Sequence, residues 1–175
     1  VSALRSVALN VPDLAAAEKF YTSTWHLTVA ARRDGVVYFR GTGVDHHLLA
    51  LHQAEGPATI RCVTLRARSM ACLDEVANAV VGAGGRLIQP VAQLDEPGGG
   101  TAVTVADADG RVFQLVYADQ LHADAHETSD QPIRLAHVVL NSHDVESTRQ
   151  FMETVFDFSL SDRTRIMAFM RCNSD

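Results

Sequence analysis

The sequence is poor in cysteine and in long apolar runs, and it has no excess of positive charge. Its three cysteines form no even or closely spaced set, which argues against a disulfide framework and favours free thiols in a reducing cytoplasm. No stretch approaches the roughly 20 apolar residues of a membrane span, and the N-terminus lacks a secretory signal pattern. The net charge of −6 excludes the basic surface typical of nucleic-acid binding. We therefore expect a cytoplasmic protein with no membrane or nucleic-acid partner.

The chain instead repeats a pattern of one strand, one helix and three strands. Three short segments rich in β-branched and aliphatic residues are alike: LRSVAL from Leu4, IRCVTL from Ile60 and LAHVVL from Leu135. The third positions of these segments are Ser6, Cys62 and His137. The first and third copies continue to match beyond Asn10 and Asn141, at a constant offset of 131 residues. This repetition predicts a chain built from βαβββ units.

A helix is expected after the first strand of every copy. Asp13 and Asp144 stand where a carboxylate can accept hydrogen bonds from a first helical turn, so we expect both to be N-caps. The matching apolar positions of these two helices are Phe20 and Trp25 in the first copy and Phe151 and Phe156 in the third. In the second copy Ser69 can cap a helix whose apolar residues recur at i, i+3, i+4 and i+7: Leu73, Val76, Ala77 and Val80.

The units divide the chain into three regions. Two complete units occupy residues 1–118, and residues 119–132 (DQLHADAHETSDQP) are polar and predict a linker. A third unit begins at residue 133 and has reached its third strand when the sequence stops at Asp175. Such a unit would leave an open sheet edge and a half-covered core. We therefore expect the sequence to be part of a longer protein, the alternative being a short chain completed by a partner subunit.

Several of these stretches resemble a known superfamily. The segments that carry the resemblance are NVPDLAAAEKFY, VGAGGRLI, DADGRVFQLV and LAHVVLNSHDV. They are similar to the vicinal oxygen chelate superfamily, which includes glyoxalase I, bleomycin-resistance proteins and extradiol dioxygenases. The resemblance implies an α+β fold of repeated βαβββ units forming half-barrels, here two complete units and a partial third. The linker and the third unit look like the two-domain extradiol dioxygenases, as does FMRCNSD near the end.

The resemblance also implies where a metal would be held. The family's ligands are two histidines on the first strands of paired units and a carboxylate on the last strand. In residues 1–118 these positions hold Ser6, Cys62 and Gln114, a poor set for a divalent cation, so we expect this region to be non-catalytic. The third unit has His137 at the first ligand position, although on chemistry alone it could be a core histidine with a satisfied hydrogen bond. The remaining ligands and every catalytic residue are expected outside these 175 residues.

Other histidines favour structural interpretations. His46 and His47 are adjacent, so on a strand they would face opposite ways, and one of them could enter the first half-barrel. His122 and His126 have the i, i+4 spacing of helical chelators, but they lie in the polar linker, where this spacing indicates coincidence. Cys62, inside a predicted strand, is expected to behave as a small apolar residue.

The function implied by the resemblance is ring cleavage in the degradation of aromatic compounds. An extradiol dioxygenase would use Fe(II) and O2 on a catechol-type diol, with His137 as one metal ligand. One alternative is another metalloenzyme of the superfamily, an isomerase or lyase of the glyoxalase kind with a different divalent ion. The other alternative is a small-molecule binding protein without catalysis. A homo-oligomer is expected in each case.

Overall fold

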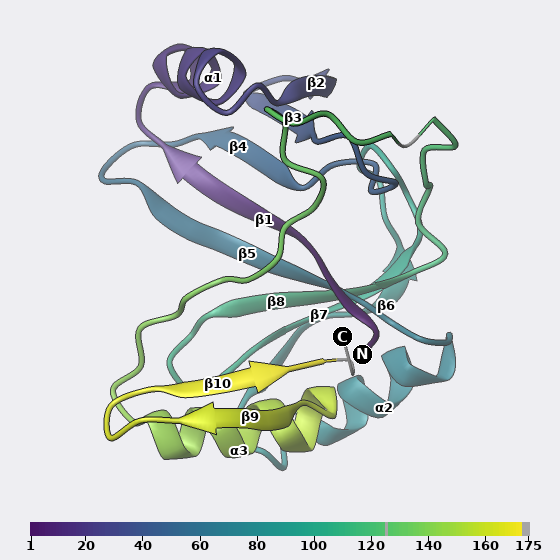
Figure 1. Ribbon diagram of the computed structural model, residues 1–175. Coiled ribbons are helices and arrows are strands. Elements are labelled where there is room, and N and C mark those ends of the chain that lie inside the picture. The colour runs from purple at the N-terminus through teal and green to yellow at the C-terminus, as the bar shows by residue number, and fades with distance from the viewer. Residues whose placement is uncertain (125, 173–175) are drawn as a thin grey trace.

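A computed structural model describes residues 1–124 and 126–172 of the chain (Figure 1). The first unit comprises β1 (Ala3–Val11), α1 (Leu14–Ser23), β2 (Thr28–Arg33), β3 (Val36–Arg40) and β4 (Leu49–Gln53). The second unit comprises β5 (Thr59–Arg66), α2 (Ala71–Ala79), β6 (Arg86–Gln93), β7 (Thr101–Ala106) and β8 (Val112–Tyr117). The third unit contains α3 (Val145–Phe156), β9 (Ser159–Arg163) and β10 (Ala168–Arg171). The α+β class and the repeated units predicted from the sequence are confirmed.

The first two units share one mixed, eight-stranded sheet in the order β2-β3-β4-β1-β5-β8-β7-β6. The two opening strands, β1 and β5, lie side by side and antiparallel at its centre. Each opening strand also pairs in parallel with the closing strand of its own unit, β1 with β4 and β5 with β8. The sheet is therefore two equivalent halves joined through β1 and β5.

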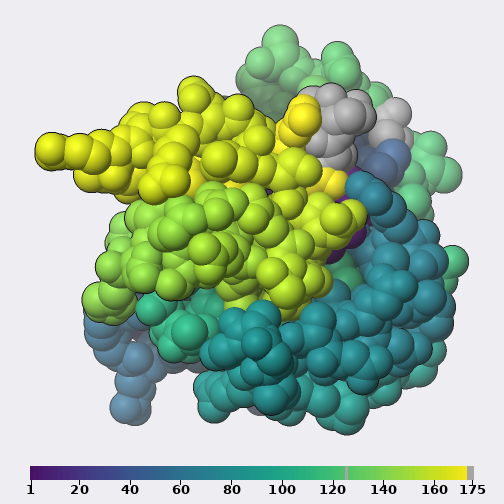
Figure 2. Space-filling model, turned by 90° about the horizontal axis from the view of Figure 1, so that it is seen from below, coloured from purple at the N-terminus to yellow at the C-terminus, as the bar shows by residue number. Residues whose placement is uncertain are grey.

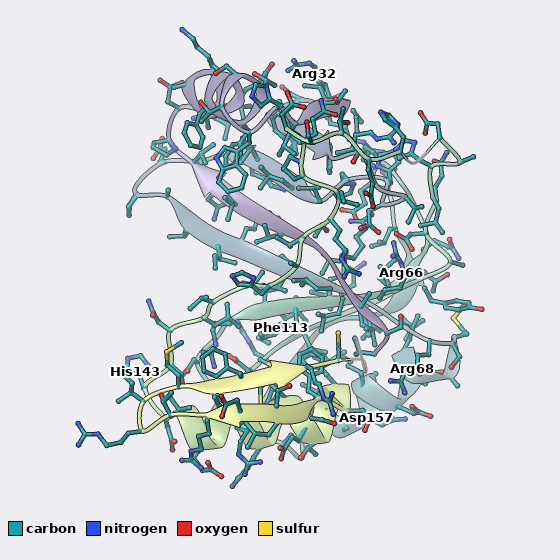
Figure 3. The ribbon with its side chains drawn as sticks, viewed as in Figure 1. Arg32, Arg66, Arg68, Phe113, His143 and Asp157 are labelled. Carbon is teal, nitrogen blue, oxygen red and sulfur yellow. The ribbon has the colours of Figure 1, made fainter. Side chains whose placement is uncertain are left out.

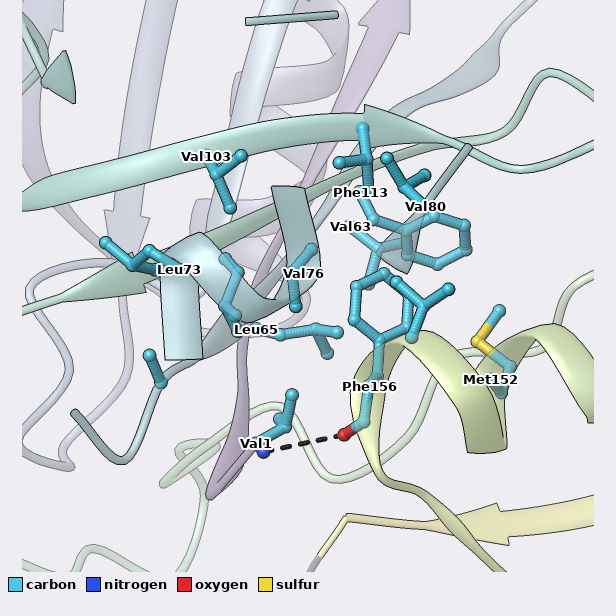
Figure 4. Close-up of a cluster of buried hydrophobic side chains, with 14 of the residues drawn as sticks. Val1, Val63, Leu65, Leu73, Val76, Val80, Val103, Phe113, Met152 and Phe156 are labelled. Carbon is cyan, nitrogen blue, oxygen red and sulfur yellow. Dashed lines mark hydrogen bonds between the residues drawn. The ribbon is translucent and has the colours of Figure 1, made fainter. Parts of the chain in front are cut away.

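Two hydrophobic clusters lie on the helical face of the sheet. The cluster beneath α1 is formed by Val11, Leu27, Val37, Phe39, Leu48, Leu49 and Leu51. The larger cluster joins the second unit to α3, and Phe156 at its centre packs against Phe113 with ring centroids 5.3 Å apart (Figure 4). In the view from below, α3 lies between α2 and the β9–β10 hairpin (Figure 2). The third unit is therefore attached to the second through a shared apolar core.

The helix starts agree with the sequence at two of three places. Asp13 accepts a hydrogen bond from the backbone N–H of Ala16, and Asp144 accepts from Glu146 and Ser147. The expected cap at Ser69 is wrong, because α2 begins at Ala71 after Met70, which provides no side-chain cap. The Ser69 hydroxyl instead lies 3.3 Å from the Cys72 sulfur.

Of the two matching helices, only α3 buries the aromatic residues that were predicted to form its apolar face. Phe151 and Phe156 are 5% and 1% exposed because α3 packs on α2 and the sheet. Their counterparts Phe20 and Trp25 are 48% and 51% exposed. No second helix covers α1 within the described residues, and so half of each ring remains in solvent.

The opening strand of the third unit is also a correction. Residues 135–140 belong to no strand, although LAHVVL was expected to form one. Its counterpart β1 is held between β4 and β5, and no equivalent pair of strands flanks residues 135–140 in the described part of the chain. A strand exists only where a neighbour completes its hydrogen bonds, which explains the difference. The third unit otherwise has its helix and its first hairpin as expected.

No helix among residues 1–124 and 126–172 combines the length and the apolar character needed to cross a membrane.

Candidate functional site

A buried arginine occupies the centre of the first half-barrel. The pairing of β1 with β5 shifts register between Leu4 and Ser6, and Arg5 stands at this irregularity with no exposed surface. Its Nη1 donates to Ser6 Oγ at 2.9 Å and lies 2.7 Å from His47 Nε2. Its Nε donates to Asp119 Oδ2 at 3.2 Å. A guanidinium is thus fixed beside the position where the family would place its first ligand.

Asp119 balances this charge together with a second arginine. Arg66 donates to both carboxylate oxygens of Asp119, at 3.1 and 2.8 Å, and its Nη1 reaches Asp45 at 2.9 Å. Burial alone would raise the pKa of Asp119, but the hydrogen bonds and charges of Arg66 and Arg5 outweigh it and hold that pKa below its usual range. Arg66 is the last residue of β5 and is labelled in Figure 3. The four residues form one ion network, in which Arg5 and Asp119 have buried side chains and Arg66 is partly exposed.

His46 and His47 both turn toward this network. They lie in the loop between β3 and β4, not in a strand, so the expectation that they face opposite ways is wrong. Burial, Arg5 and His46 together lower the pKa of His47 to about 2, and burial with Arg5 also lowers the pKa of His46. Their Nδ1 atoms are 3.1 Å apart. Both rings are therefore neutral and serve as packing and hydrogen-bonding groups around a permanent cation.

The three predicted positions in this half-barrel do not suit a metal ion. Ser6 is 2% exposed and accepts the Arg5 hydrogen bond. Burial and the charge of Glu96 raise the pKa of Cys62 to about 12, which keeps its thiol neutral. Gln114 contributes a neutral amide on β8. The Arg5 guanidinium beside Ser6 would repel a divalent cation, and the neutral Cys62 thiol and Gln114 amide would be weak ligands for one.

The glycine-rich loop after β6 closes over the arginine. Gly98 has φ +94°, and a Cβ there would lie 2.9 Å from the His46 ring and 3.1 Å from Arg5 Nη2. Nη2 itself has no hydrogen-bond partner in the described residues. Burial raises the pKa of the nearby Glu96, with Arg5 acting in the opposite sense. This network was not predicted from the sequence. The feature that could have revealed it is a charged residue within each apolar opening strand, Arg5 in LRSVAL and Arg66 in TLRA.

His137 lies at a pocket that two members of this network, Arg66 and Asp45, also line. It is exposed, and none of the described residues hydrogen-bonds to its imidazole. It lines a pocket of about 650 Å³ between the opening strands, residues 133–140 and β10. Phe113, on the pocket floor, lies between the sheet and the β9–β10 hairpin (Figure 3). His137 is therefore accessible from a pocket with both apolar and polar walls.

His137 belongs to no cluster of three potential metal ligands in the described part of the chain. Among residues 1–124 and 126–172 no three histidine, cysteine, aspartate or glutamate side chains gather as a metal site would require. His126 lines the same pocket but the linker around it is not helical, so its spacing from His122 has no chelating role. His122 instead stacks on His46 with ring centroids 5.5 Å apart. His137 could therefore supply one ligand of a set and no more.

Comparison with known proteins identifies the family. The sequence profile of the Glyoxalase/Bleomycin resistance protein/Dioxygenase superfamily matches residues 3–115. The Mn(II)-bound glyoxalase of Novosphingobium aromaticivorans aligns with 99% of this chain at a TM-score of 0.92 and 27% identity. Homoprotocatechuate 2,3-dioxygenase of Brevibacterium fuscum, in complex with 3,4-dihydroxyphenylacetate, aligns with 98% at a TM-score of 0.82 and 20% identity.

The alignments cover only part of those proteins. The present chain spans 59% of the glyoxalase and 56% of the dioxygenase. No protein of curated function matches the sequence significantly. The profile match extends over well more than half of the chain and coincides with the first two βαβββ units. The chain therefore belongs to the glyoxalase/bleomycin resistance/dioxygenase superfamily, the vicinal oxygen chelate proteins.

Proposed function

We propose that this chain is part of a divalent-metal enzyme of the superfamily whose metal-binding domain begins with the third unit. In this proposal residues 1–118 form a non-catalytic paired domain, residues 119–132 a linker, and residues 133–175 the start of the catalytic domain. The observation that carries it is the contrast between two equivalent positions. In the first unit the place is closed by the Arg5 network, whereas in the third unit His137 is accessible at a pocket.

The reaction that we propose is extradiol ring cleavage of a catechol-type diol by O2 with Fe(II). Support comes from the arrangement of a third unit after two complete ones, which aligns over 98% of this chain with a homoprotocatechuate 2,3-dioxygenase. Imidazole nitrogen is a preferred ligand of ferrous iron, and His137 has both nitrogens free of hydrogen bonds to the described residues. When bound, a ferrous ion supplies the electrons and the adjacent open coordination positions that such chemistry needs.

In this proposal the residues of this chain hold the metal ion and keep water away from one side of it. His137 would contribute one ligand. Leu4, Val63 and Phe113 form an apolar pocket wall that would keep water from that side of the site. We also propose that the protein is cytoplasmic and homo-oligomeric.

A second candidate is an isomerase or lyase of the glyoxalase kind that uses another divalent ion. The observation in its favour is the likeness to the Mn(II)-bound glyoxalase, which has the higher TM-score and identity of the two structures compared here. The two candidates differ in one respect that can be measured directly. Ring cleavage consumes O2, and isomerisation or non-oxidative lysis does not.

Oxygen uptake by the purified natural gene product tests the proposal. The protein is reconstituted anaerobically with Fe(II) or Mn(II) and mixed with a panel of substituted catechols in an oxygen electrode. The proposed function predicts one O2 consumed per ring opened, loss of this activity in His137→Ala, and its retention in His143→Ala. His143 is a matched control because its side chain is 97% exposed. Intact catechols with both metals, across the whole panel, would refute the dioxygenase assignment.

A further inference from the structure

Residues 134–140, which carry His137, lack any backbone hydrogen bond to the described part of the chain. Their placement therefore depends on what holds the two ends of the segment and on side-chain packing. Val138 and Leu140 pack against the larger hydrophobic cluster, while His137 and Val139 are exposed. Apolar packing sets the face of an extended segment, but sliding along its own axis is restrained mainly by directional bonds.

One end of the segment is held by the loop after β3. The backbone N–H of Thr42 donates to Pro132 O at 3.0 Å, and that of Gly43 donates to Ile133 O at 3.1 Å. A Cβ at Gly41 would collide with Pro132 O, and one at Gly43 would collide with Ile133 O. These two glycines therefore allow the close approach that fixes the segment four residues before His137.

The other end is held by side chains of the turn between β7 and β8 in the second unit. Asp109 accepts from Ser142 Oγ at 3.4 Å and lies 3.5 Å from His143 Nδ1. Arg111 donates from Nη1 to Asn141 O at 2.6 Å and from Nη2 to Thr148 Oγ1 at 2.9 Å. Thr148 Oγ1 lies in turn 2.7 Å from Ser142 Oγ. The guanidinium thus joins both sides of the connection between the extended segment and α3, four residues after His137.

Two carboxylates of its own turn orient the Arg111 side chain toward these contacts. Asp107, 5% exposed in the turn between β7 and β8, accepts from Arg111 Nε at 2.6 Å and from its backbone N–H at 2.9 Å. Asp109 lies 3.0 Å from Nη2. Planar guanidinium can satisfy the turn and the third unit at once, whereas an ammonium group has neither the fork nor the reach for all of these acceptors.

We propose that Arg111 is a positioning residue that sets where His137 stands relative to the first two units. It acts through Asn141 and Thr148 and does not itself touch the proposed metal site. The inference deepens the proposed function, because it assigns to the non-catalytic domain the task of placing a ligand of the catalytic one. The contacts of Arg111 exist whether or not His137 binds a metal.

The test uses two measurements on the metal-free natural protein. The first is the NMR signal of the His137 imidazole, assigned by its loss in His137→Gln. The second is the rate of tryptic cleavage after Arg134, an exposed residue of the same segment. Neither measurement requires metal or substrate, so the proposed function can fail while this inference stands, and the reverse.

Arg111→Gln is expected to move or broaden the His137 signal while the His47 signal stays in place. It is also expected to raise cleavage after Arg134 at least about threefold, because local opening exposes the segment. Thr148→Val, which removes one of the two acceptors, should change both measurements in the same sense by a smaller amount. Arg86→Gln is the matched control, since Arg86 is exposed on β6 and makes no ion pair with the described residues.

Two outcomes would overturn the inference. One is an unchanged His137 signal and unchanged cleavage in Arg111→Gln. The other is an equal response in Arg86→Gln. If Arg111→Gln does not fold, Arg111→Lys and Thr148→Val replace it, and a wild-type His137 signal in both of these variants would have the same meaning.

Discussion

Asp119→Asn is the sharpest single perturbation of the first half-barrel. The substitution keeps the shape of the side chain and removes the charge that balances Arg5 and Arg66. The Arg5 side chain is 1% exposed and that of Asp119 is 2% exposed, so solvent cannot replace the lost partner. Removing one member of a buried ion pair costs about 3–5 kcal/mol because the other charge stays buried and unbalanced.

The expected loss is large on the scale of domain stability. At roughly 2–4 °C per kcal/mol for a folded unit of about 150–250 residues, the unfolding midpoint should fall by about 6–20 °C. Arg5→Met should cost less than Asp119→Asn, because Asp119 then keeps its two hydrogen bonds from Arg66, whose side chain is 21% exposed. The double variant should be more stable than the sum of the two single losses predicts, because neither charge is left alone.

Urea unfolding followed by circular dichroism measures these differences. Asp124→Asn is the matched control, since Asp124 also pairs with an arginine but its side chain is 74% exposed. That variant should leave the urea midpoint unchanged. An Asp119→Asn midpoint equal to that of Asp124→Asn would refute the reasoning, because it would mean that the Arg5 charge is not held in a low-dielectric interior.

Three further predictions address the core, the histidines and the thiol. Phe156→Ala should lower the free energy of unfolding by about 3–5 kcal/mol in urea titrations, because the ring is 1% exposed, whereas Trp25→Ala, at 51% exposure, should cost much less; equal losses would contradict the packing described. The fold lowers the pKa of His47 from 6.5 to about 2, so below pH 6.5 the unfolded chain binds a proton that the native protein does not. Lowering the pH from 7 to 5 should therefore reduce the free energy of unfolding by about 2 kcal/mol through this group alone. His47→Gln should flatten that slope, and an unchanged slope would exclude His47 as its source. Cys62, with a pKa of about 12, should react with a thiol reagent at pH 8 far more slowly in the native protein than in the unfolded chain, as read by mass spectrometry of labelled peptides, and equal labelling rates would contradict the raised pKa.

The repeat made most of the architecture predictable. Because Asp13 and Asp144 share a sequence context, both helix starts followed from side-chain capping, which is a local property. The βαβββ order of the units followed from the strand and helix patterns, whereas the pairing of two units in one fold followed from the family resemblance. Local signals of this kind reach no further than a few residues along the chain.

The features that were not predictable depend on distant parts of the chain. Residues 135–140 have strand composition, but a strand also needs neighbours, and composition cannot supply them. Arg5 enters the interior through a local irregularity between Leu4 and Ser6, which no pattern of alternating residues reveals. The exposure of Phe20 and Trp25 likewise depends on whether a second helix lies over α1.

Metal binding to the purified natural protein tests the central claim most directly. Anaerobic titration with Fe(II), and separately with Mn(II), gives the number of ions bound per chain in the wild type, His137→Ala and His143→Ala. The account predicts one ion per chain in the wild type and in His143→Ala, none in His137→Ala, and no second ion in the half-barrel filled by Arg5. Full binding in His137→Ala, or two ions per chain in the wild type, would contradict it.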